Sequence, residues 1–236
     1  MRDVIAVVCP VLWRPERMRP FVENVLANTR ADKATDCMVV FAVSPSDTSS
    51  VVEARLCQQQ LGYKVTSVQV DGPYPGDYAR KVNRAVREWQ YVATWLLTAA
   101  DDLEFVPGWD DAVRATHERT GALVIGTNDL GNPKVKAGEH ATHSMVHRDY
   151  VKLGTVDDPT RLLHEGYQHN WVDNEFVQTA MHRGQWAFAA DAHVRHLHPV
   201  WGHGQMDATY TRGQADYHAD RELFKQRRHL WGGGGL

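Results

Sequence analysis

The first half of the chain alternates short apolar runs with segments whose apolar residues recur at helical spacing. Val4–Cys9 and Met38–Val43 are continuously apolar, which is typical of strands buried on both faces of a sheet. Further strands are predicted at Lys64–Val70 and Trp95–Leu97, with helices at 18–26, 48–61 and 77–89 between them. Strands and helices in this rhythm indicate βαβ units and a largely parallel sheet.

The second half of the chain carries the same kinds of element in a less regular order. Strands are predicted at Leu123–Gly126, Ser144–His147 and Val194–Leu197, and helices at 109–120, 173–183 and 214–228. Residues 127–138 are polar and contain glycine and proline, which indicates a loop. Because no repeat or linker interrupts the chain, residues 1–231 are expected to form one domain, followed by a flexible glycine-rich tail at 232–236.

Composition argues against several function classes. A net charge of −3 over 236 residues gives no general attraction to nucleic acid. No apolar run approaches the roughly 20 residues that cross a bilayer, and the first residues do not resemble a signal peptide. The three cysteines lack metal-ligand spacing and read as reduced core residues, so we expect a cytoplasmic protein without a membrane partner.

An acidic pair, Asp101 and Asp102, follows the predicted strand at Trp95–Leu97 and precedes the turn residues Pro107 and Gly108. Ligands of open α/β sheets bind at the carboxyl edge of the strands, where this pair is expected to lie. Adjacent carboxylates repel each other, and a divalent cation is the simplest group to hold them together. The alternative is a pair of solvated loop acids that cap the next helix, and Glu104 is interpreted as an exposed turn residue.

The segments 76–83 (Gly-Asp-Tyr-Ala-Arg-Lys-Val-Asn) and 98–107 resemble family-2-type glycosyltransferases of the GT-A fold. Those enzymes have a Tyr-Ala-x-x-x-Asn helix before the strand that ends in their acidic motif. The resemblance implies a single-domain α/β, Rossmann-like fold with a central, mostly parallel mixed sheet flanked by helices. It further implies a nucleotide-binding half at about 1–107 and an acceptor-binding, metal-completing half at about 108–231.

The same resemblance assigns roles around the nucleotide. Asp102 would hold a metal under the donor diphosphate, and Asp101 would contact the ribose or the metal's shell. Asp77 is expected to cap its helix, with Arg80 and Lys81 near the nucleotide, although an exposed helix face explains both cations equally well.

The loop 10–15 corresponds to the family's nucleoside wall. Within it, Pro10 would line the donor, Trp13 would stack on a base, and Arg14 would meet a phosphate or the base edge. The family's acidic residue after the second strand is missing from the turn that begins at Ser44, and Asp47, three residues later, is the candidate in its place.

The segment Trp171–Phe176 offers a catalytic base. It is similar to the family's Glu-Asp-x-Asp/Glu segment, in which the Asp after the first acid is the base of inverting members. That position is Asp173, with Glu175 as the fallback, but Val172 replaces the first acid. A structural cap of the following helix is the alternative for these acids.

Histidines cluster between residues 193 and 203. By the resemblance, His198 would complete the metal shell, and His196, on the same face of the predicted strand, is the second choice. A zinc hydrolase built on these histidines is an alternative that predicts tightly bound zinc. Gly202 and Gly204 suggest a mobile loop that closes over the donor.

Together these features predict an inverting glycosyltransferase that depends on Mn²⁺ or Mg²⁺ and uses a UDP- or GDP-linked sugar donor. The acceptor is left open between a protein, a glycan, a small molecule and a modified DNA base, and the oligomeric state is also open. The alternatives are a nucleotidyltransferase on the same type of sheet and a catalytically inactive sugar-nucleotide-binding module.

Overall fold

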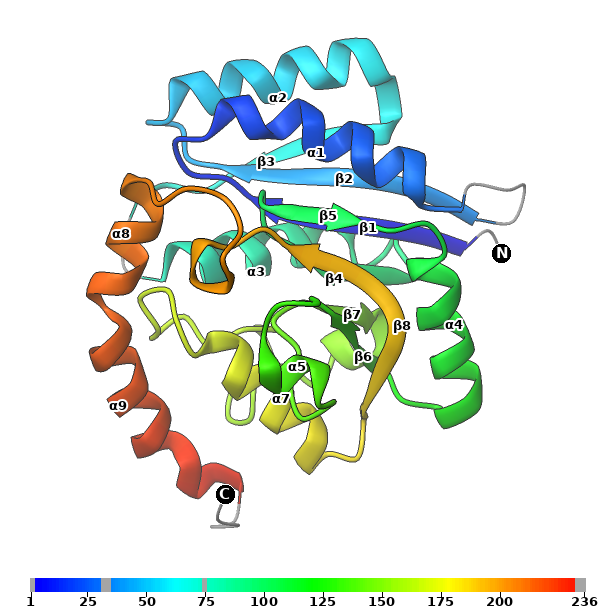
Figure 1. Cartoon of the computed structure of the whole chain (residues 1–236), viewed down its shortest axis with the longest axis vertical. Helices are drawn as coiled ribbons and strands as arrows, with labels where there is room; N and C mark the ends of the chain where they lie inside the picture. Colours follow the sequence, from blue (N-terminus) through cyan, green and yellow to red (C-terminus); the bar gives the residue numbers. More distant parts are fainter. Residues whose placement is uncertain (1–2, 31–34, 74–75, 232–236) are drawn as a thin grey trace.

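The computed structural model describes residues 3–30, 35–73 and 76–231, and in this part of the chain all strands join one eight-stranded sheet (Figure 1). The strand order is β3-β2-β1-β4-β7-β6-β8-β5. Pairs β1–β2, β1–β4, β2–β3 and β6–β8 are parallel, whereas β4–β7, β6–β7 and β5–β8 are antiparallel. The predicted single-domain α/β fold with a mixed, mostly parallel sheet is therefore confirmed. The predicted tail at 232–236 lies outside the described residues.

The elements follow one another as the alternation of apolar patterns predicts, with several additions. The first half contains β1 (Asp3–Pro10), α1 (Pro15–Asn28), β2 (Thr35–Val43), α2 (Thr48–Leu61), η1 (Gly62–Lys64), β3 (Val65–Gln69), α3 (Asp77–Trp89), β4 (Trp95–Thr98) and β5 (Leu103–Phe105). The second half contains α4 (Trp109–Thr120), β6 (Val124–Asn128), α5 (Pro133–Lys136), β7 (Ser144–His147), α6 (Arg148–Val151), α7 (Val172–His182), β8 (Trp186–His196), η2 (Pro199–Trp201), α8 (Ala208–Ala215), α9 (Tyr217–Arg227) and η3 (Arg228–Trp231).

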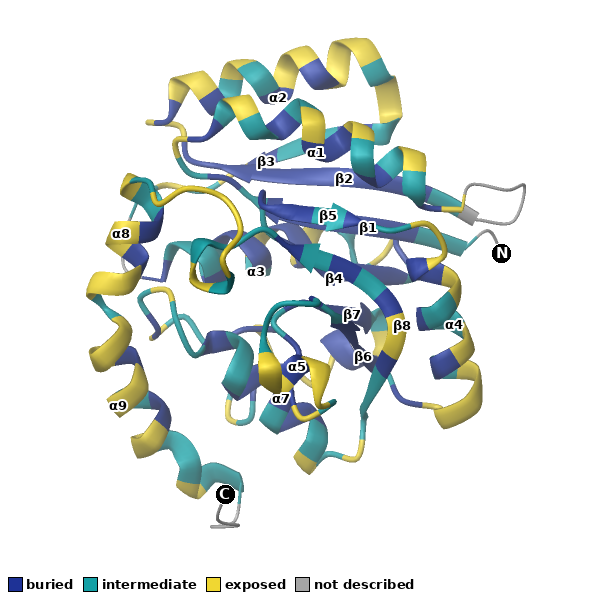
Figure 2. Cartoon of the chain, viewed as in Figure 1, coloured by how far each residue is buried: buried dark blue, intermediate teal, exposed yellow. Residues whose placement is uncertain are grey.

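Helices cover both faces of the sheet, so the central strands are buried along their length (Figure 2). One apolar cluster joins the sheet to α1, α2 and α4, and the other joins it to α3, α7 and α9. The three cysteines are free and buried in this interior, as predicted. Among the described helices, none combines the length and the apolar character that crossing a membrane requires.

The last strand differs most from the sequence-based prediction. A short strand is predicted at Val194–Leu197, but β8 already begins at Trp186 and curves past α4 to the middle of the molecule (Figure 1). Its first part mixes alanines with Trp186, Phe188 and Asp191, mostly at half-buried or exposed positions, so it has no clear alternation of polar and apolar residues.

The end of β8 pairs with β5, a strand that the sequence does not predict. Glu104, interpreted above as an exposed turn residue, lies in β5 instead and forms an ion pair of 2.6 Å with Arg195 across the strand pair. A three-residue strand is too short to show a periodic pattern, and it forms here because β8 supplies its partner.

The C-terminal helix is predicted at 214–228 but is divided into α8 and α9, which run down one side of the molecule (Figure 1). Asp220 of α9 is buried and accepts hydrogen bonds from the backbone N–H groups of Gln168, His169 and Asn170, at 2.7, 2.9 and 2.7 Å. Trp171 also packs on Phe224 of α9. These contacts join the end of the chain to the segment that leads into α7.

Replacement of Asp220 by alanine should destabilise the protein strongly. The change leaves three backbone N–H groups without their charged acceptor, and we expect it to lower the free energy of unfolding by about 3 kcal/mol. Urea denaturation followed by circular dichroism measures this loss. Glu222→Ala on the same helix is the matched control, because it removes only the exposed ion pair with Lys225 and should leave stability nearly unchanged. Equal stability losses in the two variants would contradict the assigned role of Asp220.

Candidate active site

The acidic pair lies directly after β4, at the carboxyl end of that strand, and both carboxylates are buried. Asp102 Oδ2 accepts a hydrogen bond of 2.8 Å from the Tyr210 hydroxyl of α8 and lies 3.3 Å from His196 Nε2 at the end of β8. The Leu197 N–H donates to the backbone oxygen of Asp102, at 2.8 Å. The alternative of two solvated loop acids is therefore wrong.

Asp101 faces the loop after β1 instead. Its Oδ1 accepts a hydrogen bond of 3.0 Å from Arg14 Nη1, and Arg17 Nη1 lies 3.8 Å away. The Arg14 guanidinium also donates to both carboxylate oxygens of Asp207, at 3.0 and 2.7 Å, and stacks on the Tyr210 ring, 3.9 Å from its centroid. Arg14 thus joins the β1 loop, the acidic pair and α8.

The two neighbouring carboxyl groups have different protonation behaviour. Burial and the charge of Asp102 raise the pKa of Asp101 to about 6, even though Arg14 opposes the shift. Burial also tends to raise the pKa of Asp102, but the charge and hydrogen bond of His196, together with the Tyr210 hydroxyl, hold it well below its usual range. Asp102 is therefore the member of the pair that stays ionised.

The surroundings of Asp102 fit a divalent cation. Its Oδ1 is buried and has no hydrogen-bond partner among the described residues, and the same holds for His196 Nδ1 and His143 Nε2. His143 Nδ1 donates to the Thr98 backbone oxygen, at 2.9 Å, so its Nε2 carries a lone pair. Carboxylate oxygens and imidazole nitrogens are ligands that divalent metals accept.

The histidine in contact with Asp102 is His196. His198, the first choice from the sequence, follows β8 and begins η2, where its Nδ1 accepts the Val200 N–H. Its ring centroid lies 5.2 Å from that of His196 and 4.6 Å from that of Tyr210. Burial and nearby His196 lower the pKa of His198 to about 4, which leaves it neutral.

The candidate nucleoside residues lie around the end of β1. Asp47 is buried and begins α2: its Oδ1 accepts the Ser50 N–H, and its Oδ2 accepts the Trp13 N–H at 2.6 Å. Trp13 has a left-handed backbone, with φ of 57°, and its side chain is 48% exposed. Pro10 ends β1, and Ser44 is fully buried beside this turn. Asp47 therefore shapes the loop that presents the Trp13 ring.

Helix α3 contains the Tyr-Ala-x-x-x-Asn segment and contacts the loop after β1 through Lys81. Lys81 is fully buried, and its ammonium group donates to the Val11 backbone oxygen and pairs with Asp77, both at 2.8 Å. Asp77 does not cap α3 as predicted, because Gly76 occupies the cap position and no side chain bonds the helix start. Arg80 donates to the Asp71 backbone oxygen, at 2.8 Å. The alternative of an exposed helix face is wrong for Lys81, whose contacts tie α3 to the β1 loop.

Asp173 and Glu175 occupy the first turn of α7 but face different surroundings. Asp173 Oδ2 accepts a hydrogen bond of 3.1 Å from His140 Nε2, and its side chain is 26% exposed. Neither acid is the helix cap, because Trp171 holds that position without a side-chain bond. Burial alone would raise the pKa of Asp173, but the His140 hydrogen bond keeps it below its usual value.

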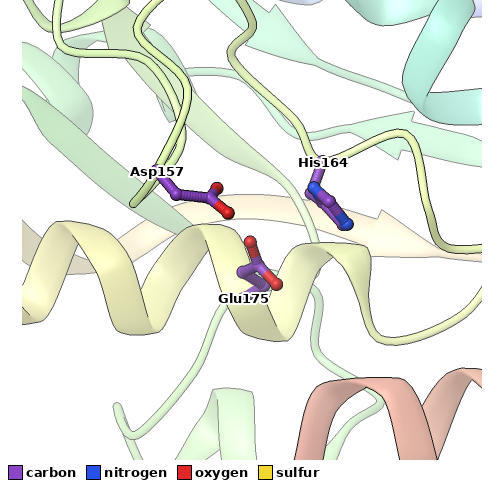
Figure 3. Close-up of side chains that lie close together, drawn as sticks. All are labelled: Asp157, His164 and Glu175. Atoms are coloured by element: carbon purple, nitrogen blue, oxygen red, sulfur yellow. The ribbon is translucent and has the colours of Figure 1, made fainter. Parts of the chain in front are cut away.

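Glu175 belongs to a separate cluster with Asp157 and His164, whose potential ligand atoms lie within 4.8 Å of one another (Figure 3). Arg227 occupies this cluster: its guanidinium bonds Glu175 at 2.7 and 2.9 Å and Asp157 at 2.8 and 3.1 Å. The Tyr167 hydroxyl also donates to Glu175, at 2.8 Å. A guanidinium already compensates these carboxylates, and Glu175 has no free position as a base.

Sequence reasoning assigned no individual role to Asp207 before α8, to Tyr210 of α8, or to His140 of the loop before β7. Asp207 resembles a helix cap in the sequence, and it does accept the Tyr210 N–H of α8, at 2.9 Å. Nothing local indicates that Tyr210 meets Asp102, that Asp207 meets Arg14, or that His140 meets Asp173.

No family model matches the sequence, and neither does any curated protein. Solved structures with the same fold include the mannosyltransferase PcManGT from Pyrobaculum calidifontis in complex with GDP-Man and Mn²⁺, with a TM-score of 0.61 at 12% identity over 100% of this chain and 77% of that one. Residues 1–349 of TarS from S. aureus in complex with UDP-GlcNAc have a TM-score of 0.58 at 14% identity over 82% of this chain and 57% of that one. The catalytic domain of Drosophila β1,4-galactosyltransferase 7 in complex with xylobiose has a TM-score of 0.55 at 13% identity over 96% and 81%. The GT-A-like fold is thus shown.

Replacement of Glu175 by glutamine should destabilise the protein, because Arg227 loses one of its two carboxylate partners in a largely buried position. We expect a loss of about 3 kcal/mol in unfolding free energy, measured by urea denaturation. Asp173→Asn is the isosteric comparison on the same helix and should cost less than half as much, since Asp173 is partly exposed. A loss for Asp173→Asn as large as that for Glu175→Gln would contradict this distinction.

His143 should make the protein sensitive to acid. Burial lowers its pKa from 6.5 to about 4, so the stability that it contributes above pH 6.5 is lost as the pH falls toward 4. Relative to His143→Asn, the wild type should therefore lose up to about 3 kcal/mol between these pH values. Urea denaturation in EDTA at several pH values measures this difference. A stability difference independent of pH would show that His143 titrates normally.

Proposed function

We propose that this protein transfers a sugar from a UDP- or GDP-linked donor to an acceptor hydroxyl, with a divalent cation at Asp102 and inversion at the anomeric carbon. The observation that carries the proposal is the buried pair after β4: Asp102 stays ionised beside His196, and its Oδ1 has no hydrogen-bond partner in the described part of the chain. The fold shared with structures that hold GDP-Man with Mn²⁺ and UDP-GlcNAc supports the same assignment.

The donor is proposed to bind between the β1 loop and the acidic pair. The exposed Trp13 ring is suited to stack on the base, with Asp101 toward the ribose and Arg14 toward the diphosphate. Asp102 and His196 would hold Mn²⁺ or Mg²⁺, with His198 next to them. When bound, such a cation neutralises the charge that develops on the leaving diphosphate.

Asp173 is proposed as the general base. Its carboxylate accepts the proton of the acceptor hydroxyl while the acceptor oxygen bonds to the anomeric carbon. The bond between that carbon and the diphosphate oxygen breaks on the opposite side, and the nucleoside diphosphate leaves with the electron pair. Partial exposure, the ionised state and the position in the first turn of a helix suit Asp173 for this role.

A thermal-shift titration with GDP-mannose and UDP-GlcNAc, each with and without Mn²⁺, tests donor and metal binding. At a ligand concentration about 100-fold above Kd, we expect a stabilisation of about 2.7 kcal/mol, or roughly 5–10 °C. Asp102→Asn should abolish the part of the shift that depends on Mn²⁺. Asp173→Asn should bind the donor normally but release nucleoside diphosphate about 10²–10⁴-fold more slowly.

Asp191→Asn, an exposed change on β8, is the control and should behave as the wild type. If no UDP- or GDP-linked sugar stabilises the wild type with or without Mn²⁺, the proposal is wrong. If donors bind but neither water nor a panel of acceptors releases nucleoside diphosphate, the alternative of an inactive sugar-nucleotide-binding module is supported instead.

A further inference from the structure

The loop that carries His140 is anchored directly after the histidine. Ala141 packs closely on Gly126 of β6: a Cβ atom added at Gly126 would lie 2.6 Å from the Cβ of Ala141. Thr142 Oγ1 donates to Asp129, at 3.0 Å, and His143 Nδ1 donates to the Thr98 backbone oxygen. His140 is itself buried, so its imidazole has a defined position.

Asp173 is anchored equally well from the other side. Asp220 of α9 holds the three backbone N–H groups that precede Trp171, and Trp171 packs on Phe224. Among the described residues, the side chain that bonds this carboxylate is His140, whose Nε2 donates to Oδ2 at 3.1 Å. Two independently fixed segments therefore meet at this one hydrogen bond.

We infer that His140 is a positioning residue for sugar transfer: its Nε2–H holds the Asp173 carboxylate in place, so that the other carboxylate oxygen faces the acceptor hydroxyl. This inference rests on the proposed function. Asp173 Oδ1 bonds only the N–H of the adjacent Asn174 among the described residues, at 3.0 Å, and keeps lone pairs for the acceptor proton. His140 exchanges no proton with the acceptor and acts only through Asp173.

The same hydrogen bond has a consequence for pH dependence. Besides His140, the titratable groups among the described residues that act on Asp173 or feel its charge include His143 from the same loop, Tyr78 of α3, His169 before α7, and His196 of β8. Burial raises the pKa of Asp173 and the His140 hydrogen bond lowers it. Loss of His140 should therefore raise that pKa, so that the base becomes protonated at a higher pH.

The test compares the wild type with His140→Ala and His140→Gln, using release of GDP from GDP-mannose and of UDP from UDP-GlcNAc in Mn²⁺. His140→Ala should lower kcat about 10-fold to 100-fold, because a carboxylate displaced by about 1 Å loses this much. The acid limb of its pH profile should shift to higher pH, while the Kd for the donor stays unchanged. His140→Gln retains an N–H donor at a similar reach and should restore part of kcat.

The histidine His182 provides the matched control, because it is exposed at the far end of α7, and His182→Gln should match the wild type. Nitrogen-15 spectra of the wild type provide a readout independent of turnover: the Nε2 of His140 should carry the proton, and Asp173→Asn should shift its resonance. If His140→Ala binds the donor tightly and keeps the kcat and the pH profile of the wild type, the inference about His140 is wrong and the proposed function is unaffected. A wild type that releases no nucleoside diphosphate would instead overturn the proposed function, and this inference with it.

Discussion

The burial of two adjacent carboxylates at the end of β4 is the constraint on which the rest of the site depends. Two ionised carboxyl groups at neighbouring positions are unfavourable in a buried site unless other groups compensate them. Arg14 comes from the loop after β1, His196 from the end of β8, and Tyr210 from α8. Segments from three distant parts of the chain therefore converge on one dipeptide, and their arrangement follows from the need to stabilise it.

The same principle separates the two acids of α7. Residues two positions apart on a helix do not face the same side. Asp173 therefore faces His140 at a partly exposed position. Glu175 is buried, and its negative charge is compensated by Arg227 and by the Tyr167 hydroxyl. The carboxylate with a guanidinium partner supports the fold, and the one with an imidazole donor keeps an exposed edge.

The support of the site extends beyond the residues that would touch a substrate. Buried Lys81 ties α3 to the β1 loop, Asp47 holds the Trp13 backbone, and Asp220 fixes the segment before α7. In each case a charged side chain forms a hydrogen bond with a backbone atom outside the regular helices and strands. Solved structures at 12–14% identity share the fold, so the arrangement of the sheet tolerates almost complete replacement of the sequence.

The sequence by itself determined the elements whose signal is local. Apolar runs located β1, β2 and β4, helical periodicity located α1 and α7, and an acidic pair after a buried strand located the centre of the candidate site. Only the tertiary structure decided that His196 rather than His198 meets Asp102, that Lys81 and Glu175 are internal supports, and that Tyr210 and His140 contact the candidate site residues Asp102 and Asp173. The physical reason is that periodicity reports which face of an element is buried, whereas the partner of a charged side chain depends on how distant segments pack. The long β8 and the short β5 belong to the second class, because β8 forms as a strand along β6 and β5 forms against the end of β8.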